Sequence, residues 1–116
     1  MKVYGIPNCN TVKKSIDWLK QNKIDIEFHD FKKLGVTAAQ LKKWIDLVGW
    51  EALVNKKGTT WRMLDAETQA SITSEKKAIA LMVEKTSVIK RPIIEVGKTI
   101  ILGFDEAQYS KQIKKK

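Results

Sequence analysis

The alternation of apolar and polar residues predicts two strands with a helix between them at the start of the chain. Residues 2 to 6 alternate as a short strand does, and residues 11 to 22 repeat their apolar positions at helical spacing. Residues 24 to 28 again alternate apolar and charged side chains, which is typical of a half-buried strand. This order indicates parallel strands joined by a right-handed crossover. The buried face of the helix is predicted to hold Val12, Ile16 and Leu19.

The middle of the chain has a helical pattern instead. After a predicted loop at residues 32 to 36, Thr37 and Gln40 form a capping box, and apolar residues continue at helical spacing to Gly49. A short helical piece is predicted at residues 51 to 55, and a longer amphipathic helix at about residues 74 to 85. We therefore expect a helical insertion at about residues 37–85.

The last part of the chain returns to strands. Two apolar runs flank residues 96 to 99 and predict a β-hairpin, and Asp105 is placed to cap a final helix that ends in Lys114–Lys116. The predicted order is β-α-β, helical insertion, β-β-α. We expect an α/β protein with one domain spanning residues 1–116.

The composition of the chain indicates which classes of binding partner it is suited to. The chain has 22 Lys and Arg against 13 Asp and Glu, a net charge of +9, yet only two of the basic residues are arginines. Aromatic residues do not alternate with arginines, so the pattern disfavours nucleic-acid binding, and most lysines fit solvated helix faces. No apolar run is long enough to span a membrane, and we expect no membrane partner.

Cys9 is the only cysteine, and it lies where the first strand gives way to the first helix. A helix N-terminus favours an anion such as a thiolate, so Cys9 is a candidate nucleophile. The alternative is an inert, buried thiol. One cysteine and one histidine are too few for a zinc site, and the lack of disulfide partners favours a reducing, cytoplasmic setting.

Arg91 and Pro92 stand at the start of the predicted third strand. A proline is tolerated there because the first residue of a strand need not donate to the ladder, and the peptide bond before it can be cis or trans. An active cysteine before the first helix and a proline opening the third strand are both features of the thioredoxin fold. The predicted order of strands and helices agrees with that fold.

Several motifs together resemble the ArsC/Spx family, and its small YffB-type branch in particular. They lie in sequence order along essentially the whole chain, and comprise Tyr4–Lys14, Gly49–Asn55, Gly58–Arg62, Ile89–Pro92 and Leu102–Phe104. The resemblance implies a thioredoxin-like fold with a helical insertion.

The resemblance implies that Cys9 matches the single nucleophilic cysteine of the family's arsenate reductases, which glutathione and glutaredoxin regenerate. In those enzymes several arginines hold the oxyanion. Arg91 matches one of these arginines, whereas Asn55 stands where another is expected. Arg62 and Lys56 are possible substitutes. Each missing charge-assisted contact costs about 1.5–3 kcal/mol, so we expect little arsenate reduction.

The Spx-like regulators offer the alternative function. The resemblance implies that they bind RNA polymerase and use a Cys-x-x-Cys pair as a redox switch. In this chain Val12 occupies the second position of that pair. The same intramolecular disulfide therefore cannot form. The alternative function that stays open is a non-enzymatic regulator or adaptor that binds RNA polymerase or another protein.

The preferred hypothesis is a monothiol, glutathione-dependent thiol reductase. Cys9 and Arg91 are its predicted catalytic residues, with Arg91 stabilising the thiolate or binding a glutathione carboxylate. We expect glutathione as a co-substrate and no bound cofactor, glutaredoxin as a possible protein partner, and a monomer. The predicted substrate-binding residues are Asn8, Asn10, Thr11, Lys13, Trp61, Arg62 and Pro92. Capping, turn formation or a solvated face would explain several of them equally well.

Overall fold

A computed structural model describes residues 1–113 of the chain, which divides into two compact units. The sheet unit comprises Met1–Leu34 and the chain from Arg91 onward, and the helical unit comprises Gly35–Lys90. The predicted insertion at residues 37–85 lies within the helical unit. Because the chain divides into two units, the single domain spanning residues 1–116 stays a prediction. The predicted end of the last helix, Lys114–Lys116, lies outside the described residues. Among residues 1–113, no helix has the length and apolar character needed to cross a membrane.

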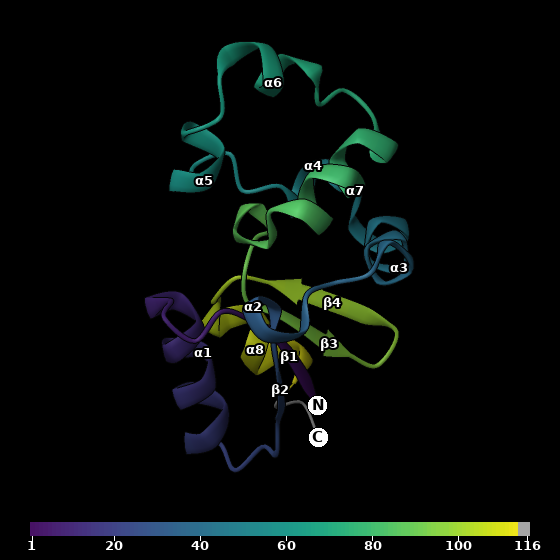
Figure 1. The fold of residues 1–116 in the computed structure, drawn as a ribbon. Coiled ribbons are helices and arrows are strands. Elements are labelled where there is room, and N and C mark those ends of the chain that lie inside the picture. Colours follow the sequence, from purple (N-terminus) through teal and green to yellow (C-terminus); the bar gives the residue numbers. More distant parts are fainter. Residues whose placement is uncertain (114–116) are drawn as a thin grey trace. The chain divides into compact units, whose positions relative to one another are not determined.

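The sheet unit is built on four strands in the order β2-β1-β3-β4 (Figure 1). The strands are β1 (Lys2–Gly5), β2 (Glu27–Asp30), β3 (Ile93–Val96) and β4 (Thr99–Leu102). β1 is parallel to β2, whereas β3 is antiparallel to both β1 and β4. The predicted β-hairpin is therefore present, with Gly97 at φ 58° in its turn. A mixed α/β protein with a thioredoxin-like fold and the predicted order of elements along the chain is confirmed.

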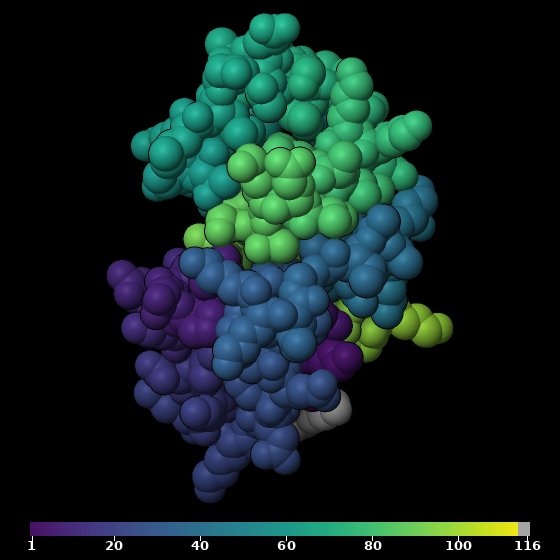
Figure 2. Space-filling view, viewed as in Figure 1, coloured from purple at the N-terminus to yellow at the C-terminus, as the bar shows by residue number. Residues whose placement is uncertain are grey.

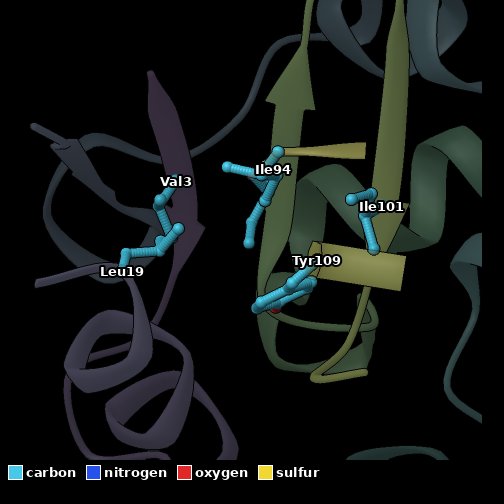
Figure 3. Packing of buried hydrophobic residues seen from close by; sticks show 6 residues of the cluster. Val3, Leu19, Ile94, Ile101 and Tyr109 are labelled. Atoms are coloured by element: carbon cyan, nitrogen blue, oxygen red, sulfur yellow. The ribbon is translucent and has the colours of Figure 1, made fainter. Parts of the chain in front are cut away.

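Two helices cover the same face of this sheet. They are α1 (Asn10–Gln21) and α8 (Glu106–Gln112). Leu19 of α1 and Tyr109 of α8 pack under Val3, Ile94 and Ile101 (Figure 3). All five are at most 1% exposed. Burying an aliphatic side chain contributes roughly 1.5–3 kcal/mol, so this cluster fixes the helices to the sheet.

The opposite face of the sheet carries an aromatic group beside β1. Tyr4 points away from the α1 side because side chains alternate along a strand. Its ring lies 5.0 Å from that of His29 and 6.2 Å from that of Phe31, which begins the short helix α2 (Phe31–Leu34). The Tyr4 hydroxyl donates to Glu95 Oε1 at 3.0 Å. The sequence pattern had indicated a loop at residues 32–36, so α2 is a correction.

The second strand also begins later than the predicted run at residues 24 to 28. Lys23 adopts φ 59°, and the N–H of Ile24 bonds back to the carbonyl of Leu19 at 2.9 Å. This is the Schellman arrangement that closes a helix. Ile24 and Ile26 pack against the core without pairing in the sheet. These two residues are apolar because their side chains cover the core where α1 ends. The strand β2 begins only at Glu27.

The helical unit contains five α-helices and one 3₁₀ helix in the described structure. They are α3 (Ala38–Val48), α4 (Trp50–Leu53), α5 (Thr59–Arg62), α6 (Ala66–Ser71), α7 (Glu75–Glu84) and η1 (Thr86–Val88). α7 packs on α3, α4 and η1. The ribbons of α5, α6 and α7 enclose an opening in Figure 1, which side chains fill in Figure 2.

Helix capping explains where these helices begin. Thr37 accepts a hydrogen bond from the N–H of Gln40, as the capping box predicted, and Ser74 accepts one from Lys77. Asp65 likewise caps α6, which the sequence reading did not single out. Each cap contributes about 1 kcal/mol.

Candidate functional site

Cys9 occupies the N-cap position of α1, directly after the turn that follows β1. Its backbone is extended, with φ −113° and ψ 123°, and its carbonyl accepts the first hydrogen bond of the helix from the N–H of Lys13 at 3.0 Å. The thiol is partly exposed. The cysteine therefore lies at the positive end of the helix dipole, as predicted, and within reach of a dissolved reactant.

Gly5 lets α1 begin close to the strand. A Cβ atom at Gly5 would lie 2.9 Å from Cγ2 of Val12, a distance that real Cβ atoms essentially never show. Val12 is fully buried and β-branched, so it has little freedom to move aside. The glycine therefore sets how near the first turn of α1 lies to β1.

Arg91 comes to the same place through the topology of the sheet. β1 and β3 run antiparallel with Tyr4 opposite Ile93, so the residues after β1 lie beside those before β3. The Arg91–Pro92 peptide bond is cis, and Pro92 is buried. The carbonyl of Pro92 accepts a hydrogen bond from the N–H of Gly103 at 2.9 Å.

The surroundings of the sulfur favour its anionic form. Burial raises the pKa of the Cys9 thiol, but the N–H groups of Val12 and Thr11 and the charge and hydrogen bond of Arg91 outweigh it. The pKa therefore lies below its ordinary value. The donors are thus arranged for a thiolate, which is the reactive form of cysteine.

The other predicted residues of the sheet unit surround this first turn. Asn8, Asn10, Thr11 and Lys13 are all exposed. Thr11 acts on the sulfur of Cys9 through its backbone N–H group and not through its side chain. Binding of a substrate by Asn8, Asn10 or Lys13 stays a prediction.

Trp61 and Arg62 belong to the helical unit, in α5. Trp61 is 8% exposed, its carbonyl accepts a hydrogen bond from Nε2 of Gln69 at 2.8 Å, and Nζ of Lys56 lies 5.5 Å from its ring centre. Arg62 is exposed. Trp61 thus has a packing role within its own unit, and a groove formed by these two residues beside Cys9 stays a prediction.

A buried polar link behind the site was missed by the sequence reading. The helix face predicted to hold Ile16 is centred on Ser15, which is fully buried, whereas Ile16 is half-buried. The Ser15 hydroxyl lies 2.9 Å from the Tyr109 hydroxyl, and the latter donates to the carbonyl of Gly103 at 2.6 Å. A serine between Val12 and Leu19 on an apolar face was the signal that could have revealed it.

The polar groups around Cys9 are hydrogen-bond donors, which suit an anion and not a metal ion. Within residues 1–113, no three His, Cys, Asp or Glu side chains gather closely enough to hold a metal. A partly exposed thiolate with fixed donors can attack an electrophilic sulfur atom, and it can also accept an anionic reactant through Arg91.

The chain matches one protein family and is similar to several known proteins. The model of the ArsC family matches residues 4–112. An uncharacterized protein of Haemophilus influenzae is 39% identical over 107 residues, covering 92% of this chain and 93% of the relative. Regulatory protein MgsR of Bacillus subtilis is 27% identical over 116 residues, covering 97% and 90%. The global transcriptional regulator Spx of Streptococcus pneumoniae is 24% identical over 102 residues, covering 86% and 75%.

Solved structures agree with the family match. A structure described as YFFB protein superposes with a TM-score of 0.91 at 38% identity and covers 97% of both chains. An arsenate reductase related protein of Brucella melitensis gives a TM-score of 0.76 at 39% identity, covering 97% of this chain and 93% of its own. The resemblance to arsenate reductase relatives and to the YffB-type branch is therefore confirmed.

Proposed function

The chain belongs to the ArsC family, and on that premise we propose that it is a glutathione-dependent thiol reductase with Cys9 as its nucleophile. One observation carries the proposal. The only thiol of the chain is partly exposed at the start of α1 and faces two backbone N–H groups and Arg91. An inert structural cysteine would be expected among apolar side chains, where the thiolate is disfavoured.

The first step of the proposed reaction is attack by the Cys9 thiolate on a disulfide that contains glutathione. A new sulfur–sulfur bond forms between Cys9 and the glutathione sulfur, the old one breaks, and the substrate sulfur leaves as a thiolate. Arg91 stabilises the attacking thiolate before the bond forms. It then remains as a cation beside the mixed disulfide, where it can pair with a glutathione carboxylate.

The second step requires a thiol from another molecule, because the chain has no second cysteine. A glutathione thiolate attacks the mixed disulfide, releases Cys9 as a thiolate and leaves as oxidised glutathione. The substrate has then gained two electrons, and one glutathione thiolate and one glutathionyl group have become the disulfide. A glutaredoxin thiol can take the place of free glutathione in this step.

A coupled assay tests this proposal. The purified chain is mixed with a glutathionylated peptide, reduced glutathione, glutathione reductase and NADPH, and NADPH consumption is followed. We expect turnover by the wild type and background consumption by Cys9→Ser, which has nearly the same shape without a nucleophilic thiol. Equal rates for the two proteins would refute the proposed activity.

Arsenate serves as a second substrate in the same assay, with glutaredoxin added. The sheet unit supplies one arginine at Cys9, and Asn55 stands where the arsenate reductases are expected to have another. We expect no arsenate-dependent turnover above that of Cys9→Ser. Robust turnover would show that other cations of this chain complete the oxyanion site.

The second candidate function is that of a regulator, and the names of two relatives favour it. MgsR is a regulatory protein and Spx is a global transcriptional regulator. Under this second hypothesis the chain binds a protein such as RNA polymerase, and Cys9 does not take part in a catalytic cycle. It predicts a stable complex with purified bacterial RNA polymerase that persists in Cys9→Ser. The reductase reading predicts turnover and no such complex.

A further inference from the structure

We propose that Ser15 and Tyr109 are positioning residues that hold the start of α1 and the start of β3 in register, and thereby keep Arg91 beside the Cys9 sulfur. The inference deepens the proposed function, because it concerns the same thiol. It assigns no chemistry to either hydroxyl group.

The first half of the link joins the two helices behind the site. The Ser15 hydroxyl lies 2.9 Å from the Tyr109 hydroxyl and 3.1 Å from the carbonyl of Thr11. Both side chains are fully buried, so water cannot replace either partner. Ser15 lies about 1.7 helical turns after Cys9, and the carbonyl it contacts belongs to the first turn of α1. The Thr11 contact lies within α1, so movement of that helix relative to α8 would strain the contact between Ser15 and Tyr109.

The second half of the link reaches β3. The Tyr109 hydroxyl donates to the carbonyl of Gly103 at 2.6 Å, and the N–H of Gly103 donates to the carbonyl of Pro92 at 2.9 Å. Arg91 directly precedes Pro92. A continuous series of contacts therefore runs from the first turn of α1 through Ser15 and Tyr109 to the residue that follows Arg91. All of these residues belong to the sheet unit.

Counting hydrogen atoms gives the direction of the bonds. The two hydroxyl groups supply two hydrogens, and that of Tyr109 is directed to Gly103. The Tyr109 oxygen can therefore only accept from Ser15, whose single hydrogen is shared between that oxygen and the carbonyl of Thr11. A phenol that donates to a carbonyl is a stronger acceptor, so each bond strengthens the other. A directional, cooperative link of this kind restricts movement more than apolar packing alone.

The alternative is that Tyr109 and Ser15 only satisfy each other within the core, with no effect on Cys9. A matched control separates the two readings. Tyr4 is also buried in the sheet unit, and its hydroxyl also donates a hydrogen bond, but to Glu95. Tyr4→Phe therefore removes one buried phenol without touching the proposed link.

The experiment measures the rate of alkylation by iodoacetamide between pH 5 and 10 for the wild type, Tyr109→Phe, Ser15→Ala and Tyr4→Phe. Because Cys9 is the only cysteine, every alkylation reports on it. We expect the midpoint of the pH–rate profile to rise in Tyr109→Phe and Ser15→Ala. The thiolate fraction below the midpoint should fall by up to about tenfold, the loss expected when the charge-assisted hydrogen bond from Arg91 is removed entirely. Tyr4→Phe should keep the wild-type midpoint.

Urea unfolding of the same proteins supplies the structural comparison. A purely structural role would lower stability in Tyr109→Phe and leave the midpoint unchanged, and that result would overturn the inference. An equal midpoint shift in Tyr4→Phe would overturn it as well. If Tyr109→Phe does not fold, Ser15→Ala decides, because it cuts the link at its other end and keeps the bond to Gly103.

This test does not depend on the proposed activity. Alkylation requires no glutathione, so the midpoint can shift as expected even if the chain proves inactive in the coupled assay. Conversely, an active chain with an unchanged midpoint in both variants would retain the proposed function and lose the positioning link.

Discussion

Replacing Arg91 by methionine tests the electrostatics of the site most sharply. The side chain keeps a similar length but loses its charge and its hydrogen bond to the sulfur of Cys9. A hydrogen bond to a charged group contributes about 1.5–3 kcal/mol, and screening at the partly exposed Cys9 places the effect near the lower end. Since about 1.4 kcal/mol corresponds to a factor of ten, the thiolate fraction at a pH well below the wild-type midpoint should fall about tenfold.

The reaction rate should change less than the thiolate fraction. A thiolate of higher pKa is intrinsically more nucleophilic, with a Brønsted coefficient of about 0.4–0.5, which returns roughly a factor of three. In Arg91→Met, the rate with a neutral pyridyl disulfide should therefore fall about threefold to fourfold well below the wild-type midpoint and rise about threefold well above the midpoint of the variant. The pH–rate profiles of the two proteins should cross.

The control for this experiment is Lys13→Met. Lys13 is an exposed cation in the first turn of α1, close in sequence to Cys9, and its side chain is not among the groups that lower the pKa of the thiol. It should react nearly as the wild type does. If Arg91→Met follows the wild-type profile, or if Lys13→Met shifts as far, the specific role of Arg91 is refuted.

Three further predictions concern stability, measured as the free energy of unfolding in urea. The pKa of the Cys9 thiol is lowered in the folded state, so its contribution is complete above the unfolded pKa of about 8.5 and is lost as pH falls through the folded pKa. The wild type should therefore gain stability relative to Cys9→Ser between pH 6 and 9, and parallel curves would contradict the lowered pKa. Gly5→Ala should lose about 1–3 kcal/mol because of the contact with Val12. Adding Val12→Ala should cost less in that background than in the wild type, and strictly additive losses would exclude the clash. Lys23→Gly should gain about 0.5–1 kcal/mol because Lys23 has φ 59°, whereas Lys20→Gly within α1 should lose about 1 kcal/mol. A loss in Lys23→Gly would contradict the backbone geometry at the end of α1.

The sequence predicts those parts of the fold in which local pattern and tertiary packing agree. The alternation at residues 2 to 6, the capping box at Thr37 and the hairpin around Gly97 each correspond to an observed element. The segment from Ile24 was misassigned because its apolar side chains cover the core while its backbone closes α1. Periodicity reports which side chains are buried, and does not show whether the backbone pairs in a sheet.

The candidate site divides in the same way. Cys9 could be singled out because the start of a helix is visible in the sequence, and Arg91 because it precedes a proline at a predicted strand. Their proximity depends on the antiparallel pairing of β1 with β3, which no local pattern encodes. The partnership of Ser15 with Tyr109 was missed for the same reason, since it joins helices from opposite ends of the chain.

The central claim is that Cys9 is a monothiol nucleophile that a separate glutathione molecule must release. Intact-mass measurement after exposure to oxidised glutathione tests it most directly, with Cys9→Ser as the control. The account predicts one glutathionyl group on the wild type and none on Cys9→Ser, and complete loss of that group when reduced glutathione is added. A wild-type chain that stays unmodified, or an adduct that reduced glutathione does not remove, would contradict it.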